Sequence, residues 1–559
     1  MTDYDYDKST AFLGEWGSYQ WRLLILLSLT IVPNGFTGLS IVFLADTPSH
    51  RCHIPAEANL SAAWMNSSIP LEVEQSRDSD AAVPSRCARY KLRVLREFSE
   101  RGLEPEDVNV SRVETEPCLD GWEYDTSVYT STIITEWDLV CDDSWKNPLT
   151  TSIHYCGVLA GSFISGQLAD RFGRKVVMFA SIAITNVFCF LQIFSPSWPV
   201  FCALYFVIGM GKISSYVTAF VLGMEVLSPR VRTAYSTAGV CLFFAAGYML
   251  MPLAAFFLRD WKSLLLGLTL PSLALVPLWW YIPESPRWLL SQGRTEEAEL
   301  VIKNAAKINK KDIPEIIFKS LQAGPLSEKK NTSYNICALL RWGSLRWLSL
   351  TLWIIWNSVT IAYFALSLNT SNLHGDVYFN CFLSALVEVP AYVLSWVMFR
   401  WCPRRLCLSS SLVMCGGFLL LIPFIPQNLT ALATALEMLG KFGATAAFTI
   451  VYAYTAELYP TVLRNTAVAT CSMAARLGSI IAPYFIYLRS LWVSLPYMLM
   501  GALTVVTGVM SLLLPESHGL PLPETVGQMQ PFPGCCVNKP YEPTGDKEEE
   551  EPIETKSSI

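Results

Sequence analysis

Twelve long apolar runs decide what this chain can fold into. Each holds about 20 mostly apolar residues between charged or turn-forming residues, enough for a helix to cross about 30 Å of hydrocarbon. Hydrophobic residues make up 52% of the chain and charged residues 16%, whereas soluble globular chains carry about 25% charged residues. The sequence therefore predicts an all-α membrane protein. The runs lie at 21–43, 146–168, 176–195, 199–222, 233–256, 262–282, 346–368, 377–399, 406–425, 430–452, 466–488 and 493–514.

Short loops between the runs set the predicted orientation in the bilayer. The loops at 170–175, 229–232 and 400–405 contain several Arg and Lys residues, whereas the short loops at 195–198, 369–376 and 426–429 carry none. Basic loops stay on the cytoplasmic side, which places both termini in the cytoplasm. The first run follows an acidic segment and precedes no cleavage site, so we interpret it as a retained span. The net charge of −6 gives no basic surface for nucleic acid.

A long polar loop at 44–145 separates the first two runs, and the predicted orientation places it outside the cell. Four cysteines in an oxidising compartment predict two disulfides, with three pairings open. These cysteines are Cys52, Cys87, Cys118 and Cys141. The loop also contains N-x-S/T sequons, which predict N-glycosylation at Asn59, Asn66 and Asn109.

The two halves of the chain repeat at a constant spacing of 232 residues. A fixed offset between matching residues indicates duplication of one structural unit, here six helices. The matching pairs are Pro283 and Pro515, Glu284 and Glu516, Glu225 and Glu457, Arg232 and Arg464, Gly211 and Gly443, and Tyr216 and Phe448. The predicted organisation is a cytoplasmic N-terminus (1–20), an N-terminal bundle (21–282), a helical cytoplasmic linker (283–345), a C-terminal bundle (346–514) and a disordered acidic cytoplasmic tail (515–559).

The loop after the second run carries a motif that resembles a transporter signature. Residues 166–175 read GQLADRFGRK and are similar to the G-x-L-a-D-r-x-G-r-[KR] string of the major facilitator superfamily. That superfamily is built from two parallel six-helix repeats, with the binding site near the membrane midplane between them. The resemblance implies this fold, twelve helices in two pseudo-symmetric bundles, and transport by alternating access.

Charged residues near the cytoplasmic ends are predicted to hold that side shut. Gly173 permits a tight turn, and Asp170 can face a helix N-terminus or a guanidinium across the seam between the halves. Residues 401–405, the second copy of the motif, lack the acid and the glycine, so the predicted latch is asymmetric. The repeated acids after spans 4 and 10 are interpreted as ion-pair partners of the repeated arginines. The predicted gating set is Asp170, Arg171, Gly173, Arg174, Glu225, Arg232, Glu457 and Arg464.

Several further motifs resemble one branch of that superfamily, the organic cation/carnitine transporters. Residues 283–289 are similar to both sugar porters and organic-ion transporters, but sugar porters lack the long cysteine-bearing loop. One departure is that the G-x-x-x-x-G-K-S string of the branch is absent after span 4, so no nucleotide site is predicted. The motifs that carry the resemblance are residues 3–5, 11–17, 33–36, 118–123, 135–141 and 456–460.

An arginine halfway through span 11 is the strongest candidate for substrate binding. Ionisable groups inside spans are costly, by about 2.5 to 3.5 kcal/mol, and therefore indicate function. A guanidinium offers a bidentate fork to a carboxylate. The resemblance implies the same role, because this position looks basic in carnitine carriers and acidic in organic cation carriers. Arg476 is thus predicted to bind a substrate carboxylate, and the alternative is a structural pair with Glu388.

An aromatic box is predicted to hold the substrate's ammonium group. A trimethylammonium group donates no hydrogen bond and is best held by ring faces. The alternative is that each ring faces lipid or core. The predicted box is Tyr216, Tyr363, Phe448 and Tyr452, with a polar cavity around Ser215, Lys212, Glu388 and Lys441.

Sodium is the predicted coupling ion. Related carnitine carriers use sodium, and the resemblance implies that the amide oxygen of Asn34 faces it. Lys212 stands where those relatives have an uncharged polar side chain, and its ammonium would either replace sodium or repel it.

The function predicted from these features is transport of carnitine-like zwitterions and organic cations across the plasma membrane. The alternatives are a carrier of ergothioneine or another betaine, a sodium-independent organic cation facilitator, or a membrane receptor. No catalytic motif indicates an enzyme and none indicates a cofactor. The C-terminal residues Ser557-Ser558-Ile559 fit a PDZ-domain ligand.

Overall fold

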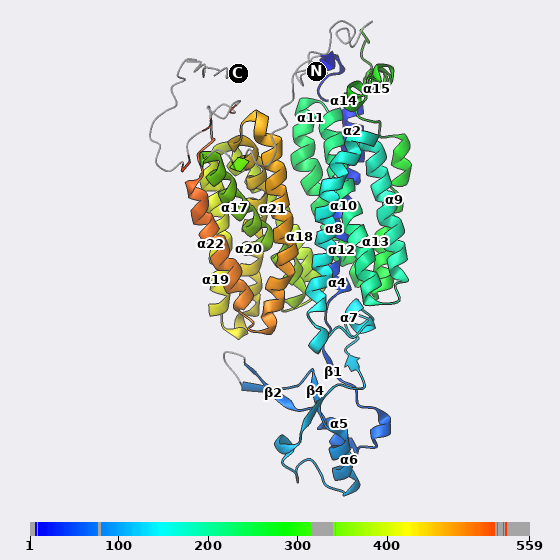
Figure 1. The fold of residues 1–559 in the computed structure, drawn as a ribbon, viewed down its shortest axis with the longest axis vertical. Coiled ribbons are helices and arrows are strands. Elements are labelled where there is room, and N and C mark those ends of the chain that lie inside the picture. The colour runs from blue at the N-terminus through cyan, green and yellow to red at the C-terminus, as the bar shows by residue number, and fades with distance from the viewer. Residues whose placement is uncertain are drawn as a thin grey trace, which may run out of the picture.

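The computed structural model describes residues 6–7, 9–75, 80–314, 339–340, 343–519, 523, 529 and 532–533. Two helical bundles stand side by side, with the N-terminus, α14 and α15 at one end and a smaller module at the other (Figure 1). We call these ends the linker face and the module face. The predicted PDZ ligand, Ser557-Ser558-Ile559, lies outside the described residues, as does most of the predicted tail.

The N-terminal bundle contains the first six predicted spans. Span 1 is broken into three pieces, because Pro33, Gly35 and Gly38 fall within seven residues of α3. Span 5 begins with a short π-helix, Tyr235–Gly239. The helices are α2 (Ser18–Leu29), α3 (Val32–Gly38), α4 (Ile41–Leu44), α8 (Lys146–Phe172), α9 (Arg174–Ile193), α10 (Trp198–Val226), α11 (Pro229–Ala234), α12 (Val240–Phe257) and α13 (Trp261–Leu273).

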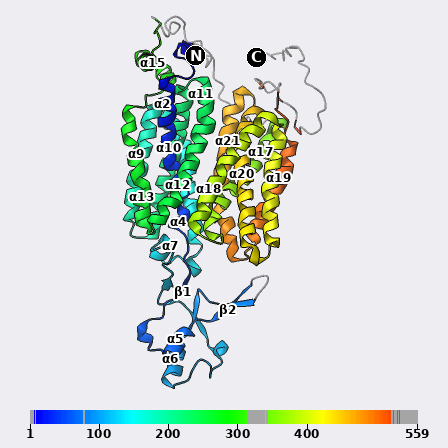
Figure 2. The same cartoon turned by 180° about the vertical axis from the view of Figure 1, so that it is seen from behind.

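The C-terminal bundle repeats the arrangement, and the view from behind shows the same two groups of helices (Figure 2). Its helices are α17 (Gly343–Leu368), α18 (Val377–Trp401), α19 (Arg404–Leu421), α20 (Thr430–Leu458), α21 (Thr461–Tyr487) and α22 (Leu495–Met510). Between the bundles in sequence lie α14 (Pro286–Ser291) and α15 (Thr295–Asn309). Asn309 at the end of α15 accepts a hydrogen bond from the backbone N–H of Tyr19 at 2.9 Å, which joins this segment to the start of span 1.

Within the described residues, 10 helices are long and apolar enough to cross a membrane by length and composition. The two predicted spans outside that set are α8 and α20, with 27 and 29 residues. Both bury polar side chains, among them His154 and Lys441, which lowers their mean hydropathy without shortening them. At 1.5 Å per residue each still exceeds about 30 Å. The architecture agrees with the predicted twelve spans.

Small residues allow close helix packing, as in α19 against α22. A Cβ added at Gly416 would lie 2.5 Å from Thr504 Oγ1 and 2.6 Å from the carbonyl oxygen of Gly501. A Cβ added at the neighbouring Gly417 meets nothing within 4 Å. Small residues at such contacts are typical of membrane helices, where van der Waals packing drives association.

These adjacent glycines make a matched test of the packing. We expect Gly416→Ala to destabilise the protein by about 1–3 kcal/mol, because the new methyl group overpacks the contact. We expect Gly417→Ala to be neutral or to stabilise by up to about 1 kcal/mol, because alanine favours helix. The thermal midpoint of each purified variant in detergent measures both effects. Equal midpoints for the two variants would contradict the α19–α22 contact.

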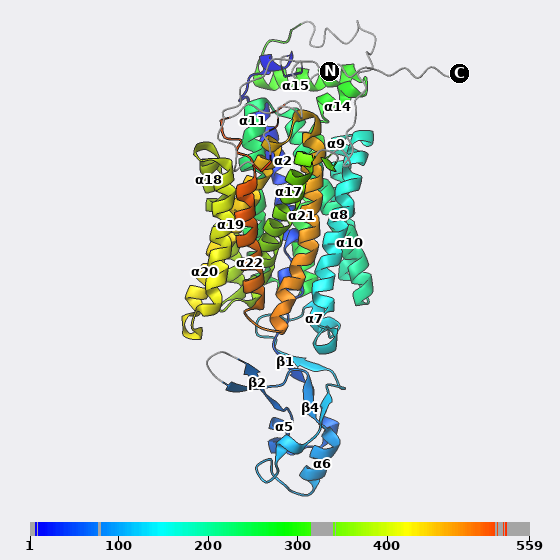
Figure 3. The ribbon, with the colours of Figure 1, turned by 60° about the vertical axis from the view of Figure 1, so that its left-hand side comes forward.

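The two bundles are joined by hydrogen bonds near the module face and midway along the spans. The Ser152 hydroxyl of α8 donates to the carbonyl oxygen of Ile480 in α21 at 2.7 Å. The Tyr248 hydroxyl of α12 donates to Ser384 Oγ of α18 at 3.1 Å. Figure 3 shows α8 and α21 running side by side toward the module. The structure is therefore closed toward the module face.

The module, residues 45–145, contains small antiparallel sheets and short helices. The strand pairs are β1 (His50–Cys52) with β6 (Trp122–Tyr124), β2 (Leu71–Gln75) with β3 (Asp80–Pro84), and β4 (Ala88–Tyr90) with β5 (Thr115–Pro117). The helices are α5 (Ala62–Asn66), α6 (Leu92–Glu100) and α7 (Ile133–Glu136). Disulfides join Cys52 to Cys118 and Cys87 to Cys141, which confirms the two predicted bridges and selects one pairing.

The stem of the module, residues 128–131, contacts both bundles. The Tyr378 hydroxyl of α18 donates to the carbonyl oxygen of Val128 at 3.1 Å. On the other side, the backbone N–H of Thr130 donates to the carbonyl oxygen of Arg259 at 3.0 Å. The backbone N–H of Trp261 donates to the carbonyl oxygen of Ser131 at 3.2 Å. The stem thus bridges the two halves where they meet.

Candidate binding site

A buried ion pair lies in the C-terminal bundle between α18 and α20. Lys441 Nζ is 3.0 Å from Glu388 Oε1, and the two side chains are 1% and 0% exposed. The hydroxyl of Tyr363 donates to the same oxygen at 2.7 Å, and that of Tyr392 donates to Oε2 at 3.1 Å. Both carboxylate oxygens therefore have partners within their own bundle. The alternative pairing of Glu388 with Arg476 is not present in the structure.

Three of the four predicted box residues form a continuous aromatic wall on α17 and α20. The ring centroids of Tyr363 and Phe448 are 5.3 Å apart in a stacked arrangement, and those of Phe448 and Tyr452 are 5.5 Å apart. Trp356 extends the wall, with its centroid 4.4 Å from that of Tyr452. Lys441 Nζ lies 3.4 Å from the Tyr363 centroid, so that ring already holds an ammonium group.

Arg476 lies in the middle of α21, half-buried at the seam between the bundles. Its Nε is buried and, among the residues described, has no hydrogen-bond partner. Tyr155 and Tyr216 of the N-terminal bundle pack in one cluster with Ile480, one helical turn after Arg476. Both rings interact electrostatically with Arg476, and Tyr216 also interacts with Tyr452. The seam therefore brings a guanidinium, which has no carboxylate partner among the described residues, close to rings from both halves.

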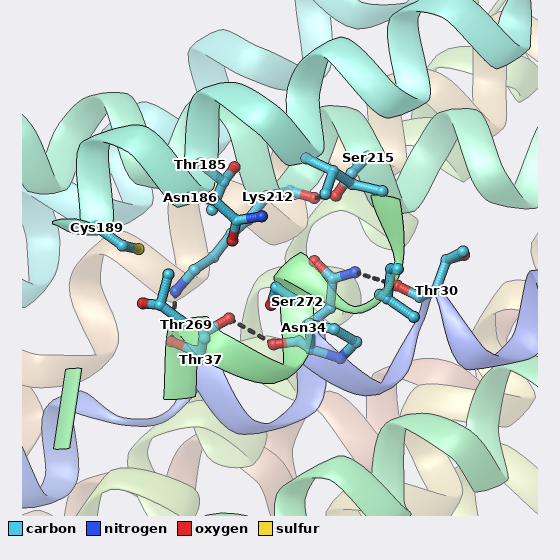
Figure 4. A pocket seen from close by; sticks show the side chains of 13 residues that line it. Thr30, Asn34, Thr37, Thr185, Asn186, Cys189, Lys212, Ser215, Thr269 and Ser272 are labelled. Carbon is cyan, nitrogen blue, oxygen red and sulfur yellow. Dashed lines mark hydrogen bonds between the residues drawn. The ribbon is translucent and has the colours of Figure 1, made fainter. Parts of the chain in front are cut away.

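A separate polar pocket lies inside the N-terminal bundle between α3, α9, α10 and α13 (Figure 4). Asn34, Lys212 and Ser215 all line it. Lys212 Nζ donates to the carbonyl oxygen of Thr37 at 2.5 Å. The predicted polar cavity is thus two sites, because Glu388 and Lys441 pair in the other bundle.

At the linker face of the N-terminal bundle, Arg174 is the centre of a charged cluster. Its guanidinium lies 2.9 Å from Asp170 Oδ1 and 3.1 Å from Glu225 Oε2. Glu284 Oε1 accepts the backbone N–H of Arg174 at 3.0 Å. Gly173 has φ +100°, and a Cβ there would lie 2.4 Å from Glu284 Oε2, which explains the glycine of the motif. Asp170 therefore pairs within its own bundle rather than across the seam.

The C-terminal bundle repeats this cluster although its motif has lost two residues. Arg404 Nε lies 3.2 Å from Glu457 Oε2, and the Arg404 backbone N–H donates to Glu516 Oε1 at 2.8 Å. Asp170 is the acid without a counterpart, because alignment of Arg174 with Arg404, at a local spacing of 230 residues, places Arg400 at its position. Among the charged members of the cluster, the predicted asymmetry is therefore limited to that acid.

The predicted ion pairs of the repeated acids with the repeated arginines are wrong. Arg232 contacts Asp7 at 3.3 Å, and Arg464 donates to the carbonyl oxygen of Tyr459 at 3.5 Å. Glu225 and Glu457 each end a long helix whose neighbouring helix brings a distant arginine beside the carboxylate. The prediction relied on proximity in sequence, but a turn that contains proline separates each acid from the arginine that follows it. Of the other gating residues, Arg171 lies over the Phe172 ring at 5.4 Å.

Sequence reasoning missed four aromatic residues around the site. Tyr392 is one helical turn after Glu388, so its position was available from the spacing. The others became visible only through packing between distant helices. The four are Tyr155, Tyr248, Trp356 and Tyr392. The sequon residues Asn59, Asn66 and Asn109 are exposed on the module, as glycosylation requires.

The family model described as "Sugar (and other) transporter" matches residues 118–526. Organic cation/carnitine transporter 2 of Homo sapiens is 54% identical over 526 residues, 94% of each chain. Solute carrier family 22 member 4 of Mus musculus is 53% identical over 546 residues, 98% of each chain. The D-xylose-proton symporter shares the fold with a TM-score of 0.56 at 13% identity, over 90% of this chain and 99% of that one.

These similarities agree with the duplicated six-helix bundles and with the motifs around spans 1, 2 and 10. The relatives and the shared fold are those of membrane transporters and not of enzymes. The chain belongs to the organic cation/carnitine transporters of the major facilitator superfamily.

Proposed function

We propose that this chain carries carnitine-like zwitterions, together with organic cations, across the plasma membrane by alternating access. The observation that supports the proposal is Arg476, a guanidinium that has no carboxylate partner in the described part of the chain and lies close to aromatic rings of both bundles. A guanidinium binds a carboxylate bidentately, and ring faces hold a trimethylammonium group. A substrate with one such group at each end matches both features.

The charges of the predicted site residues favour a substrate that carries a carboxylate. Glu388 and Lys441 neutralise each other at 3.0 Å. Among the residues described, neither Lys212 nor Arg476 has a carboxylate within ion-pair distance. An uncompensated charge in a low-dielectric environment is costly, and a substrate carboxylate reduces that cost. A purely cationic substrate gains no such compensation.

In the proposed pose, the carboxylate binds Arg476 and the ammonium group lies against Phe448, Tyr452 and Tyr216. Tyr363 contributes less to the box, because Lys441 already occupies its face at 3.4 Å. The names of two relatives, which include carnitine and organic cation, support this substrate class. Ergothioneine and other betaines carry the same two groups and remain alternative substrates.

The proposed setting is the plasma membrane, with the module outside and both termini in the cytoplasm. The basic loops on the linker face and the exposed sequons on the module support this orientation. A PDZ-domain partner at the C-terminus remains a proposal from the last residues alone. Sodium coupling, predicted from the resemblance, stays a prediction. Asn34 lies in a pocket that supports cation binding, but the same pocket holds the Lys212 ammonium.

Uptake of three labelled compounds tests the proposal. We expect oocytes that express the chain to take up carnitine or ergothioneine well above water-injected oocytes, and to take up tetraethylammonium more slowly. The ratio of carnitine to ergothioneine uptake identifies the preferred zwitterion. Uptake of tetraethylammonium without uptake of either zwitterion would contradict the proposed substrate class.

A further inference from the structure

Lys212 is a buried ammonium group that the proposed substrate pose does not use. It lies near the middle of α10, and its relative exposure is 7%. In the part of the chain that the structure describes, its ammonium group donates to a backbone carbonyl and no carboxylate lies within ion-pair distance. A buried charge is normally paired or binds a ligand, so this arrangement requires a reason.

The partner of Lys212 exists because span 1 is interrupted. The Thr37 carbonyl oxygen lies 2.5 Å from Lys212 Nζ and also accepts a hydrogen bond from Ser40 Oγ at 3.1 Å. Helix α3 ends at Gly38 and α4 begins at Ile41, so this carbonyl lies at a helix end, where intrahelical donors are missing. The break therefore presents a backbone oxygen to α10.

Neutral polar side chains line the pocket that contains the Lys212 ammonium group. Asn34, Thr269 and Ser272 line the pocket from α3 and α13, and no carboxylate of a described residue does. Asn186 of α9 also lines it, is 6% exposed, and its Nδ2 has no partner among the described residues. Figure 4 shows Thr37 and Thr269 beside the end of Lys212, with Asn34 and Ser272 farther along the same pocket. Carbonyl, amide and hydroxyl oxygens are the ligands that small hard cations take in proteins.

The pocket has little room for a second cation. Its free space admits about one water-sized molecule. A dissolved cation beside the ammonium would share the same oxygen atoms and meet a like charge at close range in a low-dielectric environment. One positive charge therefore excludes the other.

We infer that the Lys212 ammonium is a built-in monovalent cation, which fills the position that a dissolved sodium ion would take. The carrier is therefore not driven by sodium, contrary to the coupling predicted from the family resemblance, and removal of the ammonium creates a sodium site. This inference rests on the proposed function, because it concerns the ion coupling of the same carrier. It also makes Lys212 a positioning residue, which holds the broken part of span 1 against α10.

Uptake under ion replacement is the first test. With sodium replaced by N-methyl-D-glucamine, we expect zwitterion uptake by the unmodified chain to change by less than about twofold. For Lys212→Gln, whose amide is neutral, we expect zwitterion uptake without sodium to be about fivefold or more below that of the unmodified chain, and we expect added sodium to restore it. Lys212→Arg keeps the charge and is expected to remain sodium-independent. Lys262→Gln, at an exposed lysine paired with Glu136, is the control for loss of a lysine.

Thermal stability gives a readout that needs no substrate. For purified full-length protein, we expect sodium chloride to raise the midpoint of Lys212→Gln by about 2 °C or more over N-methyl-D-glucamine chloride. We expect no sodium-specific rise for the unmodified chain or for Lys212→Arg. A sodium-specific rise in Lys212→Gln alone supports the inference even if no zwitterion is transported, in which case only the proposed function fails.

Sodium dependence of the unmodified chain in either assay would overturn the inference. An equal response of Lys212→Gln and the unmodified chain to sodium would also overturn it. If Lys212→Gln fails to fold, Lys212→Asn provides a shorter neutral amide for the same tests. The measurement on the unmodified chain needs no variant, and a requirement for sodium there overturns the inference.

Discussion

Replacing Arg476 with alanine is expected to lower the uptake of a trimethylammonium carboxylate by about 10- to 100-fold. The loss of a charge-assisted bidentate contact, worth about 1.5–3 kcal/mol, sets this range. Tetraethylammonium has no carboxylate, so its uptake is expected to change less than about twofold or to rise as the positive charge is removed. Initial uptake rates below saturation, corrected for the amount of protein at the cell surface, measure the effect.

Two further variants separate charge from structure. Arg476→Lys keeps the charge but loses the fork, so we expect an intermediate rate for the zwitterion. Leu477→Ala changes the neighbouring, lipid-exposed residue of α21 and should leave both rates unchanged. Retained zwitterion uptake in Arg476→Ala, with cation uptake lost, would show that the guanidinium does not bind the carboxylate.

Breaking the Glu388–Lys441 pair is expected to have the second large effect. Glu388→Gln or Lys441→Met alone leaves one charge buried with no ionic partner, which costs about 3–5 kcal/mol. The double variant removes both charges and is expected to recover most of this loss, because a neutral replacement of a buried pair is often tolerated. Size-exclusion profiles and thermal midpoints of the purified variants measure the coupling.

The exposed pair of Glu299 and Lys303 on α15 is the matched control for the buried pair. Its atoms are 3.1 Å apart, close to the 3.0 Å of the buried pair. Lys303→Gln is expected to cost less than about 1 kcal/mol, because solvent screens the interaction. If each buried single variant is as stable as the double variant, the two side chains are not coupled.

The spans and the duplication could be predicted from the sequence, because the length of an apolar run and a fixed offset between matching residues do not depend on how helices pack. The cysteines were also readable as a set, but their pairing depends on how the strands of the module come together. Ion pairs were predicted least well. Glu225 has Arg232 seven residues away in sequence, yet its partner is Arg174 on another helix.

The candidate site was predictable in its residue types and less so in its grouping. Lys212 and Lys441 both stand on polar stripes of equivalent helices, which suggested one cavity. The structure instead gives each lysine an oxygen partner inside its own bundle, Thr37 for one and Glu388 for the other. Helical spacing assigns a residue to a face, but it does not say which of two neighbouring helices meets that face.

The stem of the module has a consequence for inhibition. Because Val128 is bonded to Tyr378 on one side and Thr130 and Ser131 to the opposite bundle on the other, opening toward the module must detach the stem from one bundle. An antibody fragment that holds the stem against both bundles would stop transport by preventing this opening rather than by competing with the substrate. Such a blocker would act equally on every compound carried.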